Sequence, residues 1–202
     1  MFDDLIKRQT PYAARSSKAE GGVEHYLTEG AVAVAFAMHL LRTSPGLKHV
    51  AIHPDGQHAK NFDFLGWLHK QGFAHEEAVG TKNYAGVYRA ATGQTILVNP
   101  KSGLGDVVAD IEGRSYVAEC KGGVINTKHA GQLSRLRSGL CEAVGLSLAT
   151  EPVEGRRQFA VVPKTATTTA LAKRMTARAR GAGVEIALVD RCGNVENVLA
   201  GR

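Results

Sequence analysis

The hairpin-like segment 105–123 carries charged side chains whose types and spacing fit metal-assisted chemistry. It reads GDVVADIEGRSYVAECKGG, so Asp106, Asp110, Glu119 and Lys121 stand among valine, alanine and isoleucine residues. An ionised side chain on a buried face is costly unless it is paired or bound to a metal ion. These charges therefore need solvent, a partner or a ligand.

The position of the turn decides which charges meet. A two-residue turn at Glu112-Gly113 pairs 111 with 114 and 109 with 116, which sets Asp106 opposite Glu119. Directly opposed residues have β-carbons about 5 Å apart, and the alternation of side chains puts Lys121 on the same face. We therefore expect Asp106, Glu119 and Lys121 to converge at the open end of the hairpin.

Asp110 is expected to stand apart from this cluster. It would lie about 13 Å along the strand, beside Ser115, as a solvated or structural carboxylate. A three-residue loop with a bulge at Gly113 would instead shift the pairing by one residue. In such a slipped register Asp110 would replace Asp106.

The expected cluster matches the needs of phosphodiester hydrolysis. Two carboxylates this close repel each other unless a cation lies between them. Both can bind one hard divalent cation, and a nearby lysine reaches a metal-bound water or a phosphate oxygen. The ion then lowers the pKa of water, and ion and lysine stabilise the charge of the transition state. The alternative is an exposed amphipathic hairpin with solvated charges and ordinary ion pairs.

The rest of the chain alternates helical and strand-like patterns. Apolar residues recur at steps near 3.6 over 23–42, and helical patterns with start or stop residues cover 61–72, 126–145 and 167–183. Patterns typical of strands, besides the two arms of the hairpin, lie at 48–54, 84–90, 95–100, 156–165 and 184–190. This order favours an α/β fold, a mixed sheet with helices on both sides.

The composition favours one globular domain with an anionic partner. The chain has 202 residues, a formal net charge of +6 and 44% hydrophobic residues. We expect a flexible basic arm over 1–21 and a single domain over 22–202. The charge favours nucleic acid over a membrane, because the sequence has no basic amphipathic anchor with bulky aromatic residues. The only sustained apolar run, 30–41, is shorter than the roughly 18 to 20 residues of a membrane span. The chain opens without the features of a secretion signal, so a cytoplasmic protein is expected.

The hairpin and the helix after it resemble the PD-(D/E)xK nuclease superfamily. Asp106, Glu119 and Lys121 carry the resemblance, and Gln132 in HAGQLSRL is similar to the glutamine found on the corresponding helix in several of its families. Gly105 stands where the name of the motif has proline, a position at which the superfamily varies.

The resemblance is best over about 95–162 and implies a restriction-endonuclease-like fold, a mixed β-sheet flanked by helices. Residues 44–93 have no counterpart in it and would be an elaboration. It also implies an endonuclease that depends on Mg²⁺, with Mn²⁺ as the alternative ion. The enzyme would be a possible homodimer if both strands of DNA are cut.

The same resemblance implies roles for individual residues. Asp106, Glu119 and the carbonyl of Cys120 would bind the metal ion, and Lys121 would orient the attacking water. Gln132 would touch a backbone phosphate or hold the lysine, unless it is a plain surface glutamine.

Members of the superfamily often add a glutamate from their first helix. Glu29, in LTEGAVAV, is the first choice here, followed by Glu24 and then Glu20. The alternative for each is a solvated glutamate on a helix face.

Three functions remain open on the sequence alone. The first is a metal-dependent nuclease, with DNA favoured over RNA as its substrate. The second is a nucleic-acid-binding module that keeps the fold but has no catalytic activity. The third is a toxin-type nuclease directed at RNA.

Overall fold

The computed structural model describes residues 4–101 and 103–198, without the side chains of residues 57 and 58. Its helical elements are α1 (Ala13–Ser16), the short 3₁₀ helix η1 (Glu20–Gly22), α2 (Glu29–Thr43), α3 (Gly56–Asn61), α4 (Phe64–Lys70), α5 (Ala130–Ala149) and α6 (Ala166–Gly181). Its strands are β1 (Ile6–Gln9), β2 (Glu24–Leu27), β3 (His49–Ile52), β4 (Phe73–Ala78), β5 (Gly86–Ala90), β6 (Thr95–Val98), β7 (Val107–Ile111), β8 (Arg114–Cys120), β9 (Gly123–Val124), β10 (Arg157–Pro163), β11 (Val184–Val189) and β12 (Val195–Asn197). No described helix is both long and apolar enough to cross a membrane.

Two sheets organise these elements. The larger has nine strands in the order β12-β11-β10-β8-β7-β3-β6-β5-β4, and the smaller is β1-β2-β9. In the larger sheet β8, β10 and β11 are parallel neighbours, β3 is parallel to β6, and the other pairs are antiparallel. The expectation of a mixed α/β sheet flanked by helices is thus confirmed.

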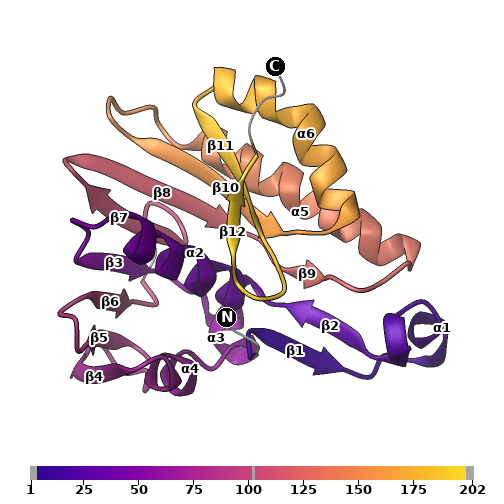
Figure 1. The fold of residues 1–202 in the computed structure, drawn as a ribbon, viewed down its shortest axis with the longest axis horizontal. Coiled ribbons are helices and arrows are strands. Elements are labelled where there is room, and N and C mark those ends of the chain that lie inside the picture. Colours follow the sequence, from indigo (N-terminus) through magenta and orange to yellow (C-terminus); the bar gives the residue numbers. More distant parts are fainter. Residues whose placement is uncertain (1–3, 102, 199–202) are drawn as a thin grey trace.

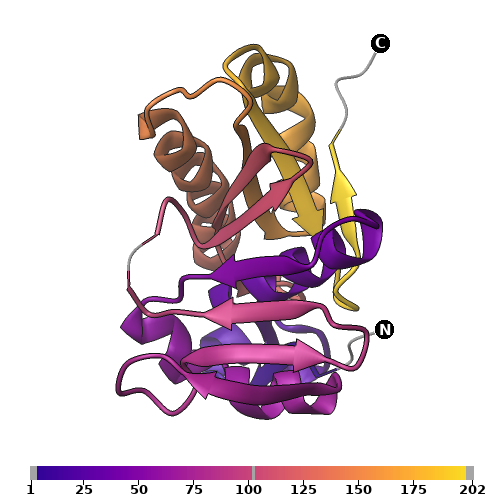
Figure 2. The same cartoon turned by 90° about the vertical axis from the view of Figure 1, so that its left-hand side faces the viewer.

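The segment 44–93, expected to be an elaboration, supplies one end of this sheet. It contributes β3, β4 and β5 together with α3 and α4. Figures 1 and 2 show α5 and α6 gathered at the opposite end of the sheet, over β10 and β11.

The two faces of the large sheet are covered unequally. One face packs on α2 and on the aromatic residues of α4, in a core that includes Ala118 and Cys120 of β8. On the other face α5 and α6 pack on β8, β10 and β11. Beyond β8, on that second face, the side chains of Val108, Ala51 and Leu97 stay partly exposed. This second face of the sheet therefore has a half that α5 and α6 cover and a more open half, with β8 at the border between them.

Several predicted helix boundaries were wrong, and two of them are instructive. The helix expected over 23–42 begins at Glu29, because Glu24–Leu27 is a strand and the side chain of Thr28 caps the helix by accepting from the N–H of Ala31 at 3.1 Å. The helix expected to end at Gly145 continues to Ala149. Burial of Ala143, Val144 and Ser147 outweighs the small cost of a glycine at position 145.

The expected flexible basic arm is instead folded in its described part, while residues 1–3 lie outside the described residues. Strand β1 pairs with β2, and the indole N–H of Trp67 donates to Asp4 at 2.8 Å. The carboxylate of Glu24, which is fully buried, forms an ion pair with Arg15 and accepts from the amide of Gln9 at 3.1 Å. A buried charge demands such partners, and they fix the segment in place.

Arg15→Ala should therefore release the N-terminal segment. It leaves Glu24 buried without its counter-charge, which typically costs about 3 kcal/mol or more. We expect a lower urea midpoint and faster hydrogen exchange in β1 and β2, whereas the exposed Arg114→Ala should change neither. Equal stability of the two variants would contradict a structural role for this ion pair.

Candidate active site

The β7–β8 hairpin has the register that the sequence predicts. Glu112 and Gly113 have positive φ angles of 54° and 75°, as a tight two-residue turn requires. Ile111 pairs with Arg114, and the ladder continues to the pair Val107 and Ala118. The alternative of a three-residue loop is excluded, and one further step of the same register brings position 106 opposite position 119.

The open end of this hairpin holds the two carboxylates. A carboxylate oxygen of Asp106 accepts from the backbone N–H of Cys120 at 2.7 Å. The Oε1 atom of Glu119 lies close to Gly105, since a β-carbon there would stand 3.2 Å from it. Asp110 lies at the other end of the hairpin and accepts from the N–H of Gly113 at 3.0 Å. It is a structural carboxylate of the turn, as expected.

Lys121 leaves the end of β8 on the face that α5 covers. Its N–H donates to the carbonyl of Val161 on β10 at 2.9 Å, so its backbone is fixed in the sheet. Its side chain packs beside Gly139, and its Nζ atom forms an ion pair with Glu142 at 2.8 Å. Glu142 lies on α5 three residues after that glycine, and its sequence position predicts only a helix and no partner for this lysine.

A close approach of two backbones brings Glu29 to the same region. A β-carbon on Gly122 would lie 2.7 Å from the N atom of Glu29 and 2.6 Å from the carbonyl oxygen of Leu27, so only glycine fits here. The first turn of α2 consequently meets the end of β8. The negative charge of Glu29 contributes to raising the pKa values of both Cys120 and Lys121.

The two other candidate glutamates lie elsewhere. Glu24 is on β2 in the buried ion pair with Arg15, and Glu20 is in η1. Gln132 is also buried, and with its amide oriented to satisfy its neighbours its oxygen accepts from the Arg15 guanidinium. Gly139 packs on Lys121, and Gln132 lies seven residues before it on α5. At 1.5 Å per residue, the two positions are about 10 Å apart along the helix axis. Gln132 thus lies beside Arg15 and its ion pair with Glu24, apart from Lys121.

Burial and mutual repulsion perturb the carboxylate pair. Burial, and next the charge of Asp106, raise the pKa of Glu119 to about 7, although Lys121 acts in the opposite direction. Burial alone would lower the pKa of Lys121, but its hydrogen bond with Glu142 and the charges of Glu29 and Asp106 raise it overall. Lys121 therefore stays a cation at neutral pH, while Glu119 is only partly ionised.

The donor set fits a magnesium ion. The described residues contain no group of three or more His, Cys, Asp or Glu side chains arranged as a metal site. However, Mg²⁺ keeps several waters and is usually held by one or two carboxylates. Asp106 and Glu119 would supply these, and a cation would relieve the repulsion that raises the pKa of Glu119. The thiol of Cys120 is buried in the core, so only its backbone carbonyl could join them.

The raised pKa predicts how Glu119→Gln changes stability with pH. The carboxyl titrates near 4.5 when unfolded and near 7 when folded, so its ionisation destabilises the fold increasingly as pH rises between these values. Near pH 8 the variant should be more stable than the parent protein, by at most about 3 kcal/mol, and the difference should vanish near pH 4. Melting curves at both pH values test this.

Magnesium extends the same experiment. Added Mg²⁺ should raise the melting temperature of the parent protein near pH 8, where Glu119 is ionised, and much less near pH 5. It should not raise that of Glu119→Gln at either pH. A stabilisation by Mg²⁺ that survives this substitution would place the ion elsewhere.

Comparison of the chain with protein-family models, with curated proteins and with solved structures gives no significant match. The function therefore has to be inferred from the arrangement of these side chains.

Proposed function

We propose that the protein is a magnesium-dependent nuclease that hydrolyses phosphodiester bonds in DNA. The observation that supports this most directly is the carboxylate pair at the end of the β7–β8 hairpin. The charge of Asp106 helps to raise the pKa of Glu119, and the cationic Lys121 follows two residues later on the same face of the strand. Such an arrangement is unfavourable by itself and becomes favourable when a divalent cation is bound.

The chain's own residues divide the chemistry between them. Asp106, Glu119 and the carbonyl of Cys120 would hold the ion, which when bound lowers the pKa of water and neutralises phosphate charge. Lys121, whose pKa is raised, acts as a cation that orients the attacking water and stabilises the charge that develops on the phosphate. It does not act as a general base, because it stays protonated at neutral pH.

Glu142 and Glu29 set the position of this lysine. The ion pair at 2.8 Å holds the Nζ atom of Lys121 on the α5 side, and Glu29 adds negative charge from the start of α2. When an anionic phosphate enters, it competes with Glu142 for the same ammonium group. Glu142 is thus a positioning residue for Lys121.

The surroundings of the pair favour a large anionic substrate. The carboxylates lie at the border between the covered half of the sheet and the half on which Val108 and Ala51 are partly exposed. A polymer can approach this border from the open half. The net charge of +6 favours nucleic acid, and DNA is the substrate we propose.

Three variants test the proposal on plasmid, linear, branched and RNA substrates with Mg²⁺ or Mn²⁺. Glu119→Gln and Lys121→Ala should each reduce DNA cleavage by about 100-fold or more, because each removes a charge that acts in the transition state. Asp110→Asn removes a carboxylate from the same hairpin but not from the site, so its cleavage should equal that of the parent protein. EDTA should abolish cleavage by the parent protein.

Each other outcome has a defined meaning. Cleavage that survives both Glu119→Gln and Lys121→Ala contradicts the proposed site. Salt-sensitive DNA binding without cleavage under either ion would contradict the enzyme and favour a binding module of the same fold. Cleavage of RNA but not of DNA would favour a nuclease of the toxin type.

A further inference from the structure

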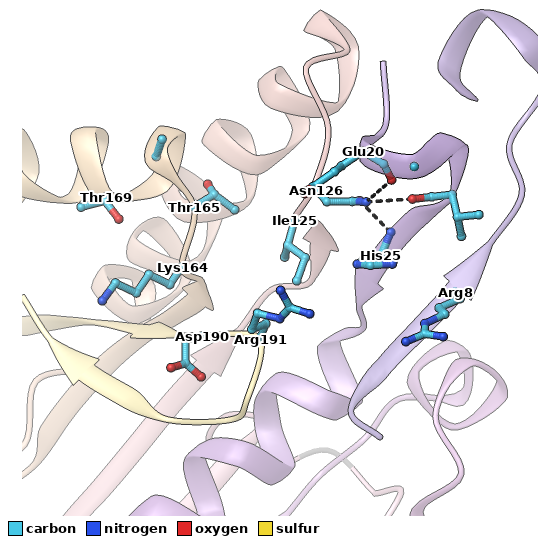
Figure 3. Close-up of a pocket in the computed structure, with 13 residues that line it drawn as sticks. Arg8, Glu20, His25, Ile125, Asn126, Lys164, Thr165, Thr169, Asp190 and Arg191 are labelled. Carbon is cyan, nitrogen blue, oxygen red and sulfur yellow. Dashed lines mark hydrogen bonds between the residues drawn. The ribbon is translucent and has the colours of Figure 1, made fainter. Parts of the chain in front are cut away.

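A charged cavity lies on the other side of β2 from the ion pair between Arg15 and Glu24. It has a volume of about 890 Å³ and lies between the β1–β2 ribbon, the start of α6 and the turn that joins β11 to β12. Arg8 and His25 are directly paired across β1 and β2, and they form one wall. Figure 3 shows the Arg191 guanidinium reaching from the β11–β12 turn toward these two side chains.

The positive charges of this cavity are only partly neutralised. Asp190 is held in its own turn by the N–H groups of Cys192 and Asn194, at 2.8 and 2.9 Å, and Lys164 forms an ion pair with Glu196. Within the described part of the chain, Arg8 and Arg191 have neither a carboxylate partner nor a hydrogen bond from their side chains. Glu20 and Asp190 also line the cavity, but among the described residues neither is an ion-pair partner of the two arginines, so Arg8 and Arg191 border it with their guanidinium groups unpaired.

The cavity also has the lining that a nucleotide unit needs. Val23 and Ile125 provide apolar surface between the charged walls, and the hydroxyl of Thr169 lies across the cavity on α6. An adjoining cavity of about 590 Å³ shares Glu20, Ile125, Asn126, Thr165 and Ala166 with the first, and it adds Lys18 and Lys128. Because they share these residues, the two cavities adjoin and are treated as one groove.

Strand β2 connects this groove to the candidate active site. His25 lies in the cavity wall, and four residues later Glu29 begins α2 beside Lys121. At about 3.3 Å per residue, the Cα atoms of His25 and Glu29 are at most about 13 Å apart. A ligand in the groove and a substrate at the carboxylates can therefore belong to one molecule that spans several phosphates.

We infer that this groove binds the phosphates of a nucleic-acid strand, with Arg8, His25 and Arg191 as the phosphate contacts. Arginine donates two parallel hydrogen bonds to a phosphate, which suits the two free guanidinium groups. The inference rests on the proposed function for its ligand, a nucleic acid. It does not depend on cleavage, because the groove contains none of the residues proposed to hold the metal ion.

The test measures binding of a fluorescein-labelled, single-stranded DNA oligonucleotide by anisotropy in EDTA. The double variant Arg8→Ala, Arg191→Ala should bind about tenfold more weakly or worse. The slope of log affinity against log salt, between about 50 and 200 mM, should fall by about 1.4, or 0.7 for each lost phosphate contact. Arg174→Ala, Arg178→Ala removes the same charge from exposed positions of α6 and should change affinity less than twofold.

A lysine variant and a competing mononucleotide separate phosphate binding by a strand from other causes of weaker binding. Arg8→Lys, Arg191→Lys keeps the charge but loses the paired hydrogen bonds, so its affinity should fall between that of the parent protein and that of the alanine variant, and melting curves establish that each variant folds. Adenosine monophosphate, with one phosphate, should displace the oligonucleotide only weakly. Full displacement by the mononucleotide would show that the groove takes a free nucleotide instead of a strand, and this outcome overturns the inference.

Equal losses in the two alanine variants would also overturn it, since the effect would then be one of net charge. Failure of this inference is distinguishable from failure of the proposed function. Normal binding by the Arg8 and Arg191 variant together with magnesium-dependent cleavage rejects the groove alone. Weakened binding by that variant, in a protein that cuts no substrate, rejects the nuclease and keeps the groove.

Discussion

A two-residue turn fixes which residues of its two antiparallel strands face each other, and the candidate site depends on this constraint. The positive φ angles of Glu112 and Gly113 fix the turn, and the ladder above it fixes the pairs up to Val107 and Ala118. The opposition of Asp106 and Glu119 is a consequence of that pairing. Every other part of the site, including Lys121 and the start of α2, is arranged around the end of these strands.

The charges at this end balance only as a group. Burial and Asp106 oppose ionisation of Glu119, while the carboxylates around Lys121 favour its charged form. The cost of holding two carboxylates together is accepted at a position where β8 borders the open half of the sheet. A purely structural site would need only one carboxylate paired with Lys121, and Glu142 already forms that pair. A second and third carboxylate nearby add repulsion without adding a partner.

The sequence was informative where neighbours in space are also close along the chain. The turn and its register followed from Glu112-Gly113 and from the alternation of the strands, and the separate role of Asp110 followed from the same parity. By contrast, the pairing of Lys121 with Glu142 depends on how α5 lies across β8, and no local pattern encodes that angle. The Arg15–Glu24 pair was missed because a glycine-containing, basic segment resembles a mobile tail until its buried partner is known. Gln132 was expected near the lysine on the basis of resemblance, yet it lies beside Arg15.

The turn at 112–113 also limits how this chain can change in length during evolution. Side chains alternate along both arms, so an insertion of one residue in either arm would turn one carboxylate toward α2 and the other toward α5. Two residues added to each arm would preserve the facing pair and only lengthen the hairpin. The tip of the hairpin is exposed, yet its residue count is held by a site some 20 Å away.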